Sequence, residues 1–308
     1  MSHIYDVIII GGGPAGYSAA LYSSRAGLDT LVIEKFSVGG QLTLTDVIDN
    51  YPGFEEGIDG ISLGFKMQQG AERYGAKTEY DEIIDVSLDG KIKSVKGTEN
   101  EYKAKAVIIA TGANPRELGV QKEQELVGRG IHYCAHCDGR FYKDKVVAVV
   151  GGGNSAVEDA IYLSRLAKKV YLIHRRNELR ATKIYHEPLL KAENVEFVWN
   201  SRVIELIADN RLSGIKVENL ITSEVEDIEC DGLFVSIGRK PATELFEDKV
   251  ALDEHDYIIA DESTKTNIDG VFAVGDVRTK ALRQVVTAVS DGATAAYFAE
   301  EYINNIGN

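Results

Sequence analysis

The chain has 308 residues, of which 44% are hydrophobic and 27% charged, a composition typical of a globular protein with room for two domains. Its formal net charge of −14 argues against nucleic acid and anionic membranes as partners, because both are negatively charged. Three cysteines are too few for a secreted protein held by disulfides, and no apolar run is long enough for a membrane span. No basic segment precedes the first apolar run, as it would in a signal peptide. We therefore expect a cytoplasmic protein.

The first predicted unit opens with a buried strand, a glycine-rich turn and a helix. Residues 6–10 lead directly into Gly11-Gly12-Gly13-Pro14-Ala15-Gly16. The glycines of such a turn permit a tight bend and a close approach of the backbone to a pyrophosphate, and the helix start offers free N–H groups. Glu34 ends the second strand, where its carboxylate can accept hydrogen bonds from ribose hydroxyls and would repel a 2′-phosphate. The pattern predicts FAD or NAD at this turn.

A cysteine pair of redox spacing, Cys134-Ala135-His136-Cys137, comes next. Thiolates are the nucleophiles of disulfide exchange, and two intervening residues allow a small ring to open and close. Asp138 follows directly, and it is either a general acid for a leaving thiolate or a reduced flavin, or a turn residue before Gly139. Zinc is the main alternative for the pair, although only His132 and His136 are near enough in sequence to complete four ligands.

The strand, glycine turn and helix then occur a second time, 140 residues after the first copy. Residues 146–150 lead into Gly151-Gly152-Gly153-Asn154-Ser155-Ala156, and no gap is needed through the following helix and second strand. A further echo relates residues 107–115 to residues 233–241. The duplication predicts two related α/β units, each built on a buried parallel strand.

The second unit differs from the first at the end of its second strand. His174-Arg175-Arg176 stands where the first unit has Glu34, with Arg180 expected one helical turn beyond. Guanidinium groups bind phosphates bidentately and stay charged. The second turn is therefore predicted to bind NADP, and the alternative is a solvated basic face.

The last segment is predicted to complete the first unit, because it lacks a glycine turn of its own. It contains a strand-like run at 270–274 and a helical run from about 284 to 302. Asp276, at the end of the strand-like run, can bind a ribityl hydroxyl and favours FAD over NAD; an ordinary Gly-Asp turn is the alternative. We expect an α/β fold of two Rossmann-like domains, with an NADPH domain (115–242) inserted between the two parts of an FAD domain (1–114 and 243–308) by crossings near Pro115 and Pro241.

Over its whole length the sequence resembles the low-molecular-weight, bacterial-type thioredoxin reductases. The motifs that carry the resemblance are Gly11–Gly16, Gly39-Gly40-Gln41-Leu42, Asn50-Tyr51-Pro52-Gly53, Cys134–Gly139, Gly151–Ala156, His174–Arg180, Gly275-Asp276 and Arg283-Gln284-Val285. The resemblance implies a homodimer that carries electrons from NADPH through FAD to the Cys134–Cys137 disulfide and on to thioredoxin. It also implies that the NADPH domain rotates between the two half-reactions.

The resemblance assigns roles to individual residues. Cys137 is expected to face the flavin, Cys134 to attack the disulfide of thioredoxin, and Asp138 to donate the proton; no metal is expected. The expected FAD residues are Gly11, Gly13, Pro14, Ala15, Gly16, Glu34, Lys35, Gly39, Gly40, Gln41, Asn50, Thr111, Gly112, Gly275, Asp276, Arg283, Gln284 and Val285. The expected NADPH residues are Gly151, Gly153, Asn154, Ser155, Ala156, His174, Arg175, Arg176 and Arg180.

One position departs from the family pattern, which usually has threonine where this chain has His136. A cationic imidazole between the cysteines would stabilise a thiolate, so we expect a more oxidising disulfide.

Other functions stay open at this point. One is a ferredoxin-driven thioredoxin reductase, whose NADPH motifs are expected to be degraded, and another is a ferredoxin–NADP reductase, which needs no dithiol. A third is a flavin reductase component for another thioredoxin-like disulfide protein or for a peroxide-reducing system. The last is a non-catalytic redox sensor.

Overall fold

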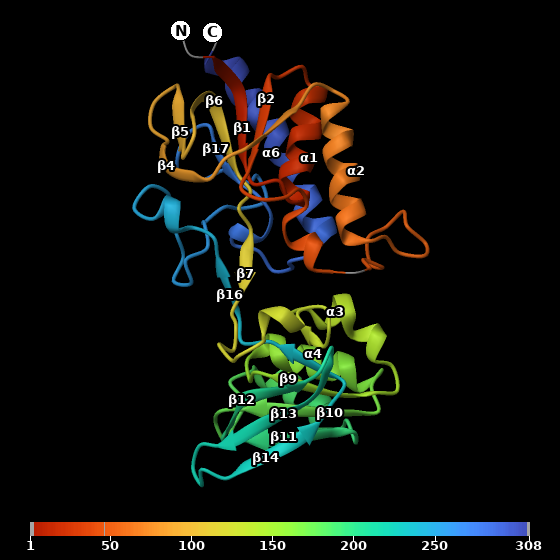
Figure 1. Ribbon diagram of the computed structural model, residues 1–308. Helices are drawn as coiled ribbons and strands as arrows, with labels where there is room; N and C mark the ends of the chain where they lie inside the picture. The colour runs from red at the N-terminus through yellow and green to blue at the C-terminus, as the bar shows by residue number, and fades with distance from the viewer. Residues whose placement is uncertain (1–2, 46, 307–308) are drawn as a thin grey trace. The chain divides into compact units, whose positions relative to one another are not determined.

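A computed structural model describes residues 3–45 and 47–306 of the chain (Figure 1). The chain forms two compact units, one from Met1–Asn114 with Lys240–Asn308 and the other from Pro115–Arg239. The predicted α/β architecture, with one Rossmann-like unit inserted into another, is confirmed.

The chain returns to the first unit at Lys240, three residues earlier than the expected boundary at 243. The reason is local pairing of the backbone. Strand β16 (Arg239–Pro241) pairs with strand β7 (Ala113–Pro115), so both crossings run in one two-stranded ribbon (Figure 1). Beyond it, the Ala242 N–H donates to the carbonyl of Gly112 (3.0 Å), which fixes Ala242 to the first unit.

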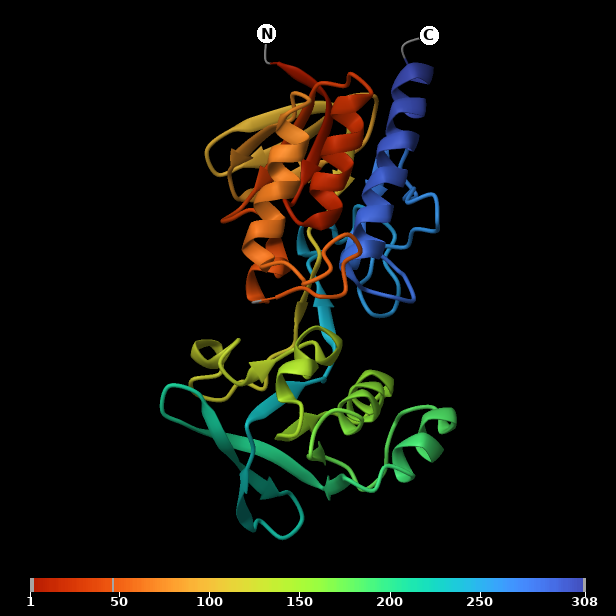
Figure 2. The ribbon, with the colours of Figure 1, turned by 90° about the vertical axis from the view of Figure 1, so that its right-hand side faces the viewer.

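The first unit is built on a seven-stranded sheet in the order β3-β2-β1-β6-β5-β4, with β17 paired to β6. Its centre is parallel and fully buried, as continuous apolar strands require. Helix α1 packs between α2 and the long α6, as Figure 2 shows, and Gly292 of α6 lies so close to α1 that a Cβ there would collide with the Ala15 carbonyl. The elements are β1 (Ile4–Ile10), α1 (Pro14–Arg25), β2 (Thr30–Glu34), η1 (Gly40–Leu44), α2 (Gly60–Glu72), β3 (Lys77–Tyr80), β4 (Ile83–Ser87), β5 (Lys93–Gly97), β6 (Glu101–Ile109), η5 (Glu244–Phe246), β17 (Val271–Ala273), η6 (Gly275–Val277) and α6 (Val285–Ile306).

The second unit contains a parallel five-stranded sheet, β11-β10-β9-β15-β8, and an antiparallel three-stranded sheet, β12-β13-β14. The elements are η2 (Gln124–Leu126), β8 (Ile131–His132), α3 (Ala135–Asp138), η3 (Gly139–Tyr142), β9 (Val146–Val150), α4 (Asn154–Ser164), β10 (Lys169–His174), η4 (Lys183–Tyr185), α5 (His186–Leu190), β11 (Val195–Trp199), β12 (Ser201–Ala208), β13 (Leu212–Asn219), β14 (Val225–Glu229) and β15 (Gly232–Val235).

The sequence duplication is also a structural one. In each unit the first strand lies between the second strand and a later parallel strand, giving β2-β1-β6 in one sheet and β10-β9-β15 in the other. β6 and β15 are the strands of the second sequence echo. None of the helices formed by residues 3–45 and 47–306 is long and apolar enough to cross a membrane.

Candidate active site

The first glycine turn has the shape that a dinucleotide pyrophosphate requires. Gly11 has a positive φ of 108°, and a Cβ there would collide with the carbonyl oxygen of Ala110. A Cβ on Gly16 would likewise collide with the Gly11 carbonyl, so helix α1 can approach the turn only with glycine at this position. By contrast, a Cβ on Gly13 would have no neighbour within 4 Å. This open side, next to the uncapped start of α1 at Pro14 and Ala15, fits a bound phosphate.

Glu34 places its carboxylate at the same turn. Its Oε2 accepts a hydrogen bond from the Gly12 N–H (2.6 Å), while Oε1 accepts from the N–H of Lys35 (2.8 Å). The Gly39 N–H donates to the Gly12 carbonyl (2.8 Å), which brings the segment Gly39–Gln41 onto the turn. An acidic acceptor in this place fits an adenosine with a free 2′-hydroxyl.

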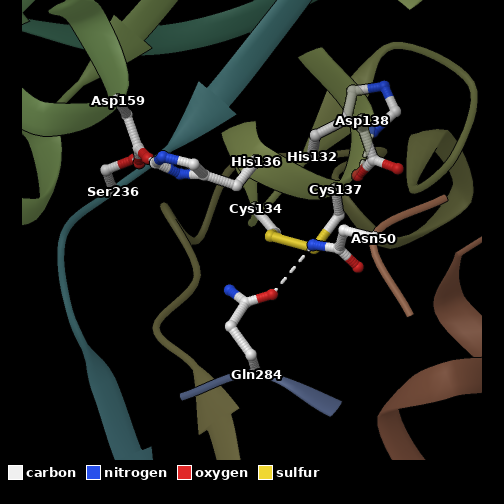
Figure 3. The surroundings of a disulfide bond; sticks show 9 residues. All are labelled: Asn50, His132, Cys134, His136, Cys137, Asp138, Asp159, Ser236 and Gln284. Atoms are coloured by element: carbon white, nitrogen blue, oxygen red, sulfur yellow. Dashed lines mark hydrogen bonds and ion pairs between the residues drawn. A yellow bond between two sulfur atoms is a disulfide. The ribbon is translucent and has the colours of Figure 1, made fainter. Parts of the chain in front are cut away.

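Other expected FAD residues come together from distant parts of the sequence. The Asn50 side-chain amide donates to Oε1 of Gln284 (3.0 Å; Figure 3). Arg283 stacks its guanidinium over the ring of Tyr257, 4.1 Å from the centroid, and Val285 begins α6. Thr111 and Gly112, which are also expected FAD residues, lie between β6 and β7, and the Thr111 hydroxyl donates to the Ala242 carbonyl (2.7 Å).

The turn that carries Asp276 is held by Asp291, which sequence reasoning missed. The buried Asp291 carboxylate accepts hydrogen bonds from the Gly275 N–H (2.9 Å), from Arg278 (2.7 and 2.9 Å) and from Lys280 (2.8 Å). Burial alone would raise the pKa of Asp291, but the bonds from Arg278 and Lys280 outweigh it and lower that pKa. The carboxylate therefore stays ionised and fixes the turn.

The second glycine turn repeats the geometry of the first, with the Ser236 carbonyl in the place of the Ala110 carbonyl. A Cβ on Gly151 would collide with the Ser236 carbonyl and with Cβ of Ala156, whereas a Cβ on Gly153 would have no neighbour within 4 Å. Helix α4 begins at Asn154 and Ser155 without a side-chain cap. The open side again fits a phosphate.

His174 occupies the place of Glu34 in this unit. Its ring lies where a Cβ of Gly152 would be, only 4% of the residue is exposed, and its Nε2 has no hydrogen-bond partner within the described chain. Burial lowers the pKa of His174, and the charges of Arg180, Arg176 and Arg175 lower it further. A buried neutral ring with one unpaired nitrogen fits a site completed by a polar ligand.

The expectation that Arg180 lies one helical turn beyond Arg176 is wrong, because residues 175–182 contain no helix. The N–H groups of Arg180 and Ala181 instead donate to the Gly152 carbonyl (2.7 and 3.1 Å), and the Thr182 N–H donates to the Asn154 side chain (2.9 Å). These donors are used by the glycine turn and are not available for helical hydrogen bonds. The loop nevertheless keeps Arg175, Arg176 and Arg180 exposed and close enough to His174 for their charges to lower its pKa.

The two cysteines of the motif form a disulfide, Cys134–Cys137, across the short helix α3 (Figure 3). The N–H groups of Cys137 and Asp138 both point to the Cys134 carbonyl (3.3 and 3.2 Å). This pairing favours the redox interpretation of the motif over the zinc interpretation. Within residues 3–45 and 47–306 there is no group of three or more His, Cys, Asp or Glu side chains arranged for a metal ion.

Two histidines beside the cysteines each pair with a carboxylate. His132 contacts Asp138, with 3.0 Å between Nδ1 and Oδ2, and both residues are buried. His136 is half-exposed, stacks on Tyr162 and lies 3.7 Å from Oδ1 of Asp159. The sequence carried no signal for either pairing beyond the presence of the residues.

Known proteins are similar to this chain over nearly its whole length. The sequence model of the family of pyridine nucleotide-disulphide oxidoreductases matches residues 5–292. A thioredoxin reductase of Peptoclostridium acidaminophilum is 48% identical over 309 residues, covering 98% of both chains, and that of Bacillus subtilis is 46% identical over 305 residues, covering 98% of this chain and 96% of its own. The thioredoxin reductase structure from Streptococcus pyogenes MGAS5005 matches with a TM-score of 0.92 at 42% identity, covering 99% of this chain and 100% of that one. That of Lactococcus lactis, described as the FR conformation, matches with a TM-score of 0.71 at 41% identity, covering 98% and 99%.

Proposed function

Because the chain belongs to the pyridine nucleotide-disulphide oxidoreductases, and among them to the thioredoxin reductases, we propose that it reduces the disulfide of a thioredoxin with electrons from NADPH. The observation that carries the proposal is the Cys134–Cys137 disulfide in the same compact unit as the second glycine turn. The family uses FAD and NADPH. The disulfide speaks against a ferredoxin–NADP reductase, and the intact arginine loop against a ferredoxin-driven enzyme.

We assign FAD to the first unit. FAD, when bound, supplies the chemistry of accepting a hydride from NADPH and passing two electrons to a disulfide. The turn from Gly11 to Gly16 would hold its pyrophosphate, Glu34 its adenosine ribose, and Asp276, on the turn fixed by Asp291, its ribityl chain. The pair Asn50–Gln284 and the segment from Arg283 to Val285 would hold the isoalloxazine ring.

We assign NADPH to the second unit. The turn from Gly151 to Ala156 would hold the pyrophosphate, and the exposed Arg175, Arg176 and Arg180 would bind the 2′-phosphate. Guanidinium groups suit this task because they bind phosphate with two parallel hydrogen bonds. The unpaired Nε2 of His174 would give the nucleotide one further buried polar contact.

The cysteines divide the exchange reaction between them. Reduction of the Cys134–Cys137 disulfide takes two electrons and yields a thiolate and a thiol after one proton is added. The Cys134 thiolate then attacks the thioredoxin disulfide, which breaks that bond and forms a mixed disulfide. Cys137 attacks Cys134 in turn and releases reduced thioredoxin. We assign to Asp138 the proton that the leaving thiolate requires.

Three further properties complete the proposal. The β7–β16 ribbon serves as the hinge for rotation of the NADPH domain.

The first unit pairs with a second copy of the chain through its helices. Large apolar side chains on α1, α2 and α6 are about half exposed or more, as expected of a surface that a partner covers: Tyr22, Ile61, Phe65 and Tyr297. The protein works in the reducing cytoplasm, where a disulfide is catalytic rather than structural.

The test is an anaerobic titration of the FAD-loaded protein with NADPH or NADH, followed by oxidised thioredoxin. NADPH should bleach the flavin absorbance at lower concentration than NADH, and thioredoxin should restore it. Cys134→Ser with Cys137→Ser should still bleach but should not be reoxidised by thioredoxin. Bleaching of the wild type that no thioredoxin reverses would overturn the proposal, and turnover would exclude a non-catalytic sensor.

A further inference from the structure

The buried carboxyl group of Asp138 has a specific partner in His132. Asp138 is 7% and His132 8% exposed, and His132 Nδ1 lies 3.0 Å from Asp138 Oδ2 (Figure 3). A buried carboxyl group exchanges protons with water slowly unless a polar path reaches it. A group that donates one proton in each turnover needs such a path.

A second hydrogen bond continues from His132 to Tyr142, on the side of the exposed Arg211. The Nε2 of His132 lies 2.7 Å from the hydroxyl of Tyr142, which is 2% exposed, and the charge of the exposed Arg211 acts on Tyr142. Once Asp138 is a carboxylate it can only accept, so Nδ1 of the neutral ring carries the ring proton and Nε2 accepts from the Tyr142 hydroxyl. The neutral imidazole then carries its proton on Nδ1 and donates it to Asp138. Every donor in the chain points toward Asp138.

The imidazole ring is held rigidly in this path. His132 pairs with Phe234 across strands β8 and β15, and the two rings stack at 5.2 Å. The Tyr142 ring meets His132 and Phe234 edge-on, at 5.2 and 5.4 Å. Burial raises the pKa of Tyr142 to about 12, so its hydroxyl keeps its proton between turnovers.

We propose that His132 positions the carboxyl group of Asp138 and supplies its proton through Tyr142. After Asp138 has given its proton to the leaving thiolate, His132 passes the Nδ1 proton to the carboxylate and takes the Tyr142 hydroxyl proton at Nε2. Tyr142 then takes a proton from water that reaches it from the side of the exposed Arg211 and Lys145. No electrons move in these steps, and the inference rests on the acid role of Asp138 in the proposed function.

Three charged groups besides Asp138 set the electrostatic field along the path. Besides Asp138 on α3, the Tyr142 end faces Arg211 in the turn between β12 and β13, Asp231 before β15 and Lys145, whose Nζ lies 5.4 Å from the Tyr142 ring. Arg211 lowers the pKa of Tyr142 against the effect of burial, while Asp138 and Asp231 raise it. The positive groups lie at the solvent end, where they would stabilise a transient tyrosinate.

The experiment compares His132→Asn, Tyr142→Phe and Asp138→Asn in the FAD-loaded enzyme. The rate at which NADPH-reduced enzyme reduces thioredoxin is followed by stopped-flow absorbance from pH 6 to pH 9. Acid catalysis contributes about 10²–10⁴ in rate, so Asp138→Asn should lose about that factor. His132→Asn keeps a donor near Nδ1 but cannot relay, and it should lose roughly tenfold or more, with the deficit growing as the pH rises. His255→Asn, an exposed histidine of the first unit, is the matched control.

The outcomes separate the relay from the proposed function. Wild-type rates and pH profiles in both His132→Asn and Tyr142→Phe would overturn the relay while leaving the reductase assignment intact. An equal loss at every pH would reduce His132 to a structural residue and overturn the relay as well. Failure of Asp138→Asn to slow the reaction would overturn both the acid role and the relay. Should His132→Asn not fold, Tyr142→Phe decides, because it removes one hydroxyl and keeps the ring.

Discussion

His136 of the cysteine motif shares Asp159 with Ser236, although the three residues come from separate segments of the chain. His136 Nδ1 lies 3.7 Å from Oδ1 of Asp159 on helix α4, and the Ser236 hydroxyl donates to Oδ2 (2.5 Å; Figure 3). The pairing of its imidazolium with the Asp159 carboxylate raises the pKa of His136, against the effect of burial. The imidazolium form is therefore favoured, but its charge lies beside a carboxylate that offsets it.

The first prediction concerns the redox potential of the disulfide. His136→Thr should make the Cys134–Cys137 pair more reducing, because it removes a cation next to a thiolate. Since Asp159 offsets that cation, the shift should not exceed roughly 30 mV, which corresponds to tenfold in the equilibrium constant. Equilibration with a glutathione buffer measures it, and potentials equal within error would refute the role of His136.

The second prediction concerns the titration of His136 itself. Because the pKa of His136 is raised in the fold, its pairing with Asp159 contributes its full stabilisation at pH values below the ordinary histidine pKa of about 6.5. This contribution is lost as the pH rises through the raised pKa. Asp159→Asn should bring the pKa of His136 back down. Histidine C2-proton NMR titration, assigned with His136→Asn, follows it directly. A pKa unaffected by Asp159→Asn would contradict the pairing.

The third prediction tests the cofactor preference of the second unit. Arg175→Ala with Arg176→Ala should raise the KM for NADPH strongly, because each charge-assisted hydrogen bond contributes about 1.5–3 kcal/mol, or roughly tenfold or more in affinity. The KM for NADH should change little. Steady-state kinetics with both nucleotides measures this, and equal effects on the two would rule out the 2′-phosphate role.

The fourth prediction separates folding from ligand binding at the first turn. Gly16→Ala should destabilise the apoprotein, since its Cβ would collide with the Gly11 carbonyl. Gly13→Ala has free space within the protein and should change the free energy of unfolding by less than about 0.5 kcal/mol. It should nevertheless weaken the binding of FAD, because the added methyl group would fill the side of the turn that is open to phosphate. Urea unfolding and fluorescence titration of FAD give the two values, and unchanged FAD affinity in Gly13→Ala would count against this site.

The fifth prediction concerns Asp291. Asp291→Asn leaves Arg278 and Lys280 buried without their counter-ion, so the free energy of unfolding should fall by about 3 kcal/mol and FAD should be released more easily. Because the pKa of Asp291 is lowered in the fold, its stabilisation is present above the ordinary aspartate value of about 3.9 and is lost as the pH falls through the lowered value. Glu301→Gln, an exposed residue of the same helix, should have no effect. Equal stability of the two variants would contradict the argument.

The amino-acid sequence by itself determined the two related α/β units, both glycine turns, and the contrast between Glu34 and His174 at the ends of the second strands. These features are local, because a buried strand, a glycine turn and a helix start lie within a short stretch of chain. The cysteine motif was equally visible, since its two sulfurs are three residues apart. The insertion of one unit into the other followed from the duplication together with the last segment, which lacks a glycine turn of its own.

Only the tertiary structure decided which side chains meet. Strand pairing between β8 and β15 stacks His132 on Phe234, while the adjoining segments bring Asp138 and Tyr142 to the two nitrogens of its ring. The backbone donors of the arginine loop go to the Gly152 carbonyl and not to a helix, and a carboxylate of α6 fixes the turn that begins at Gly275. These contacts join residues through strand register and loop closure. A periodic pattern in the sequence records neither, because it reports only which face of an element is buried.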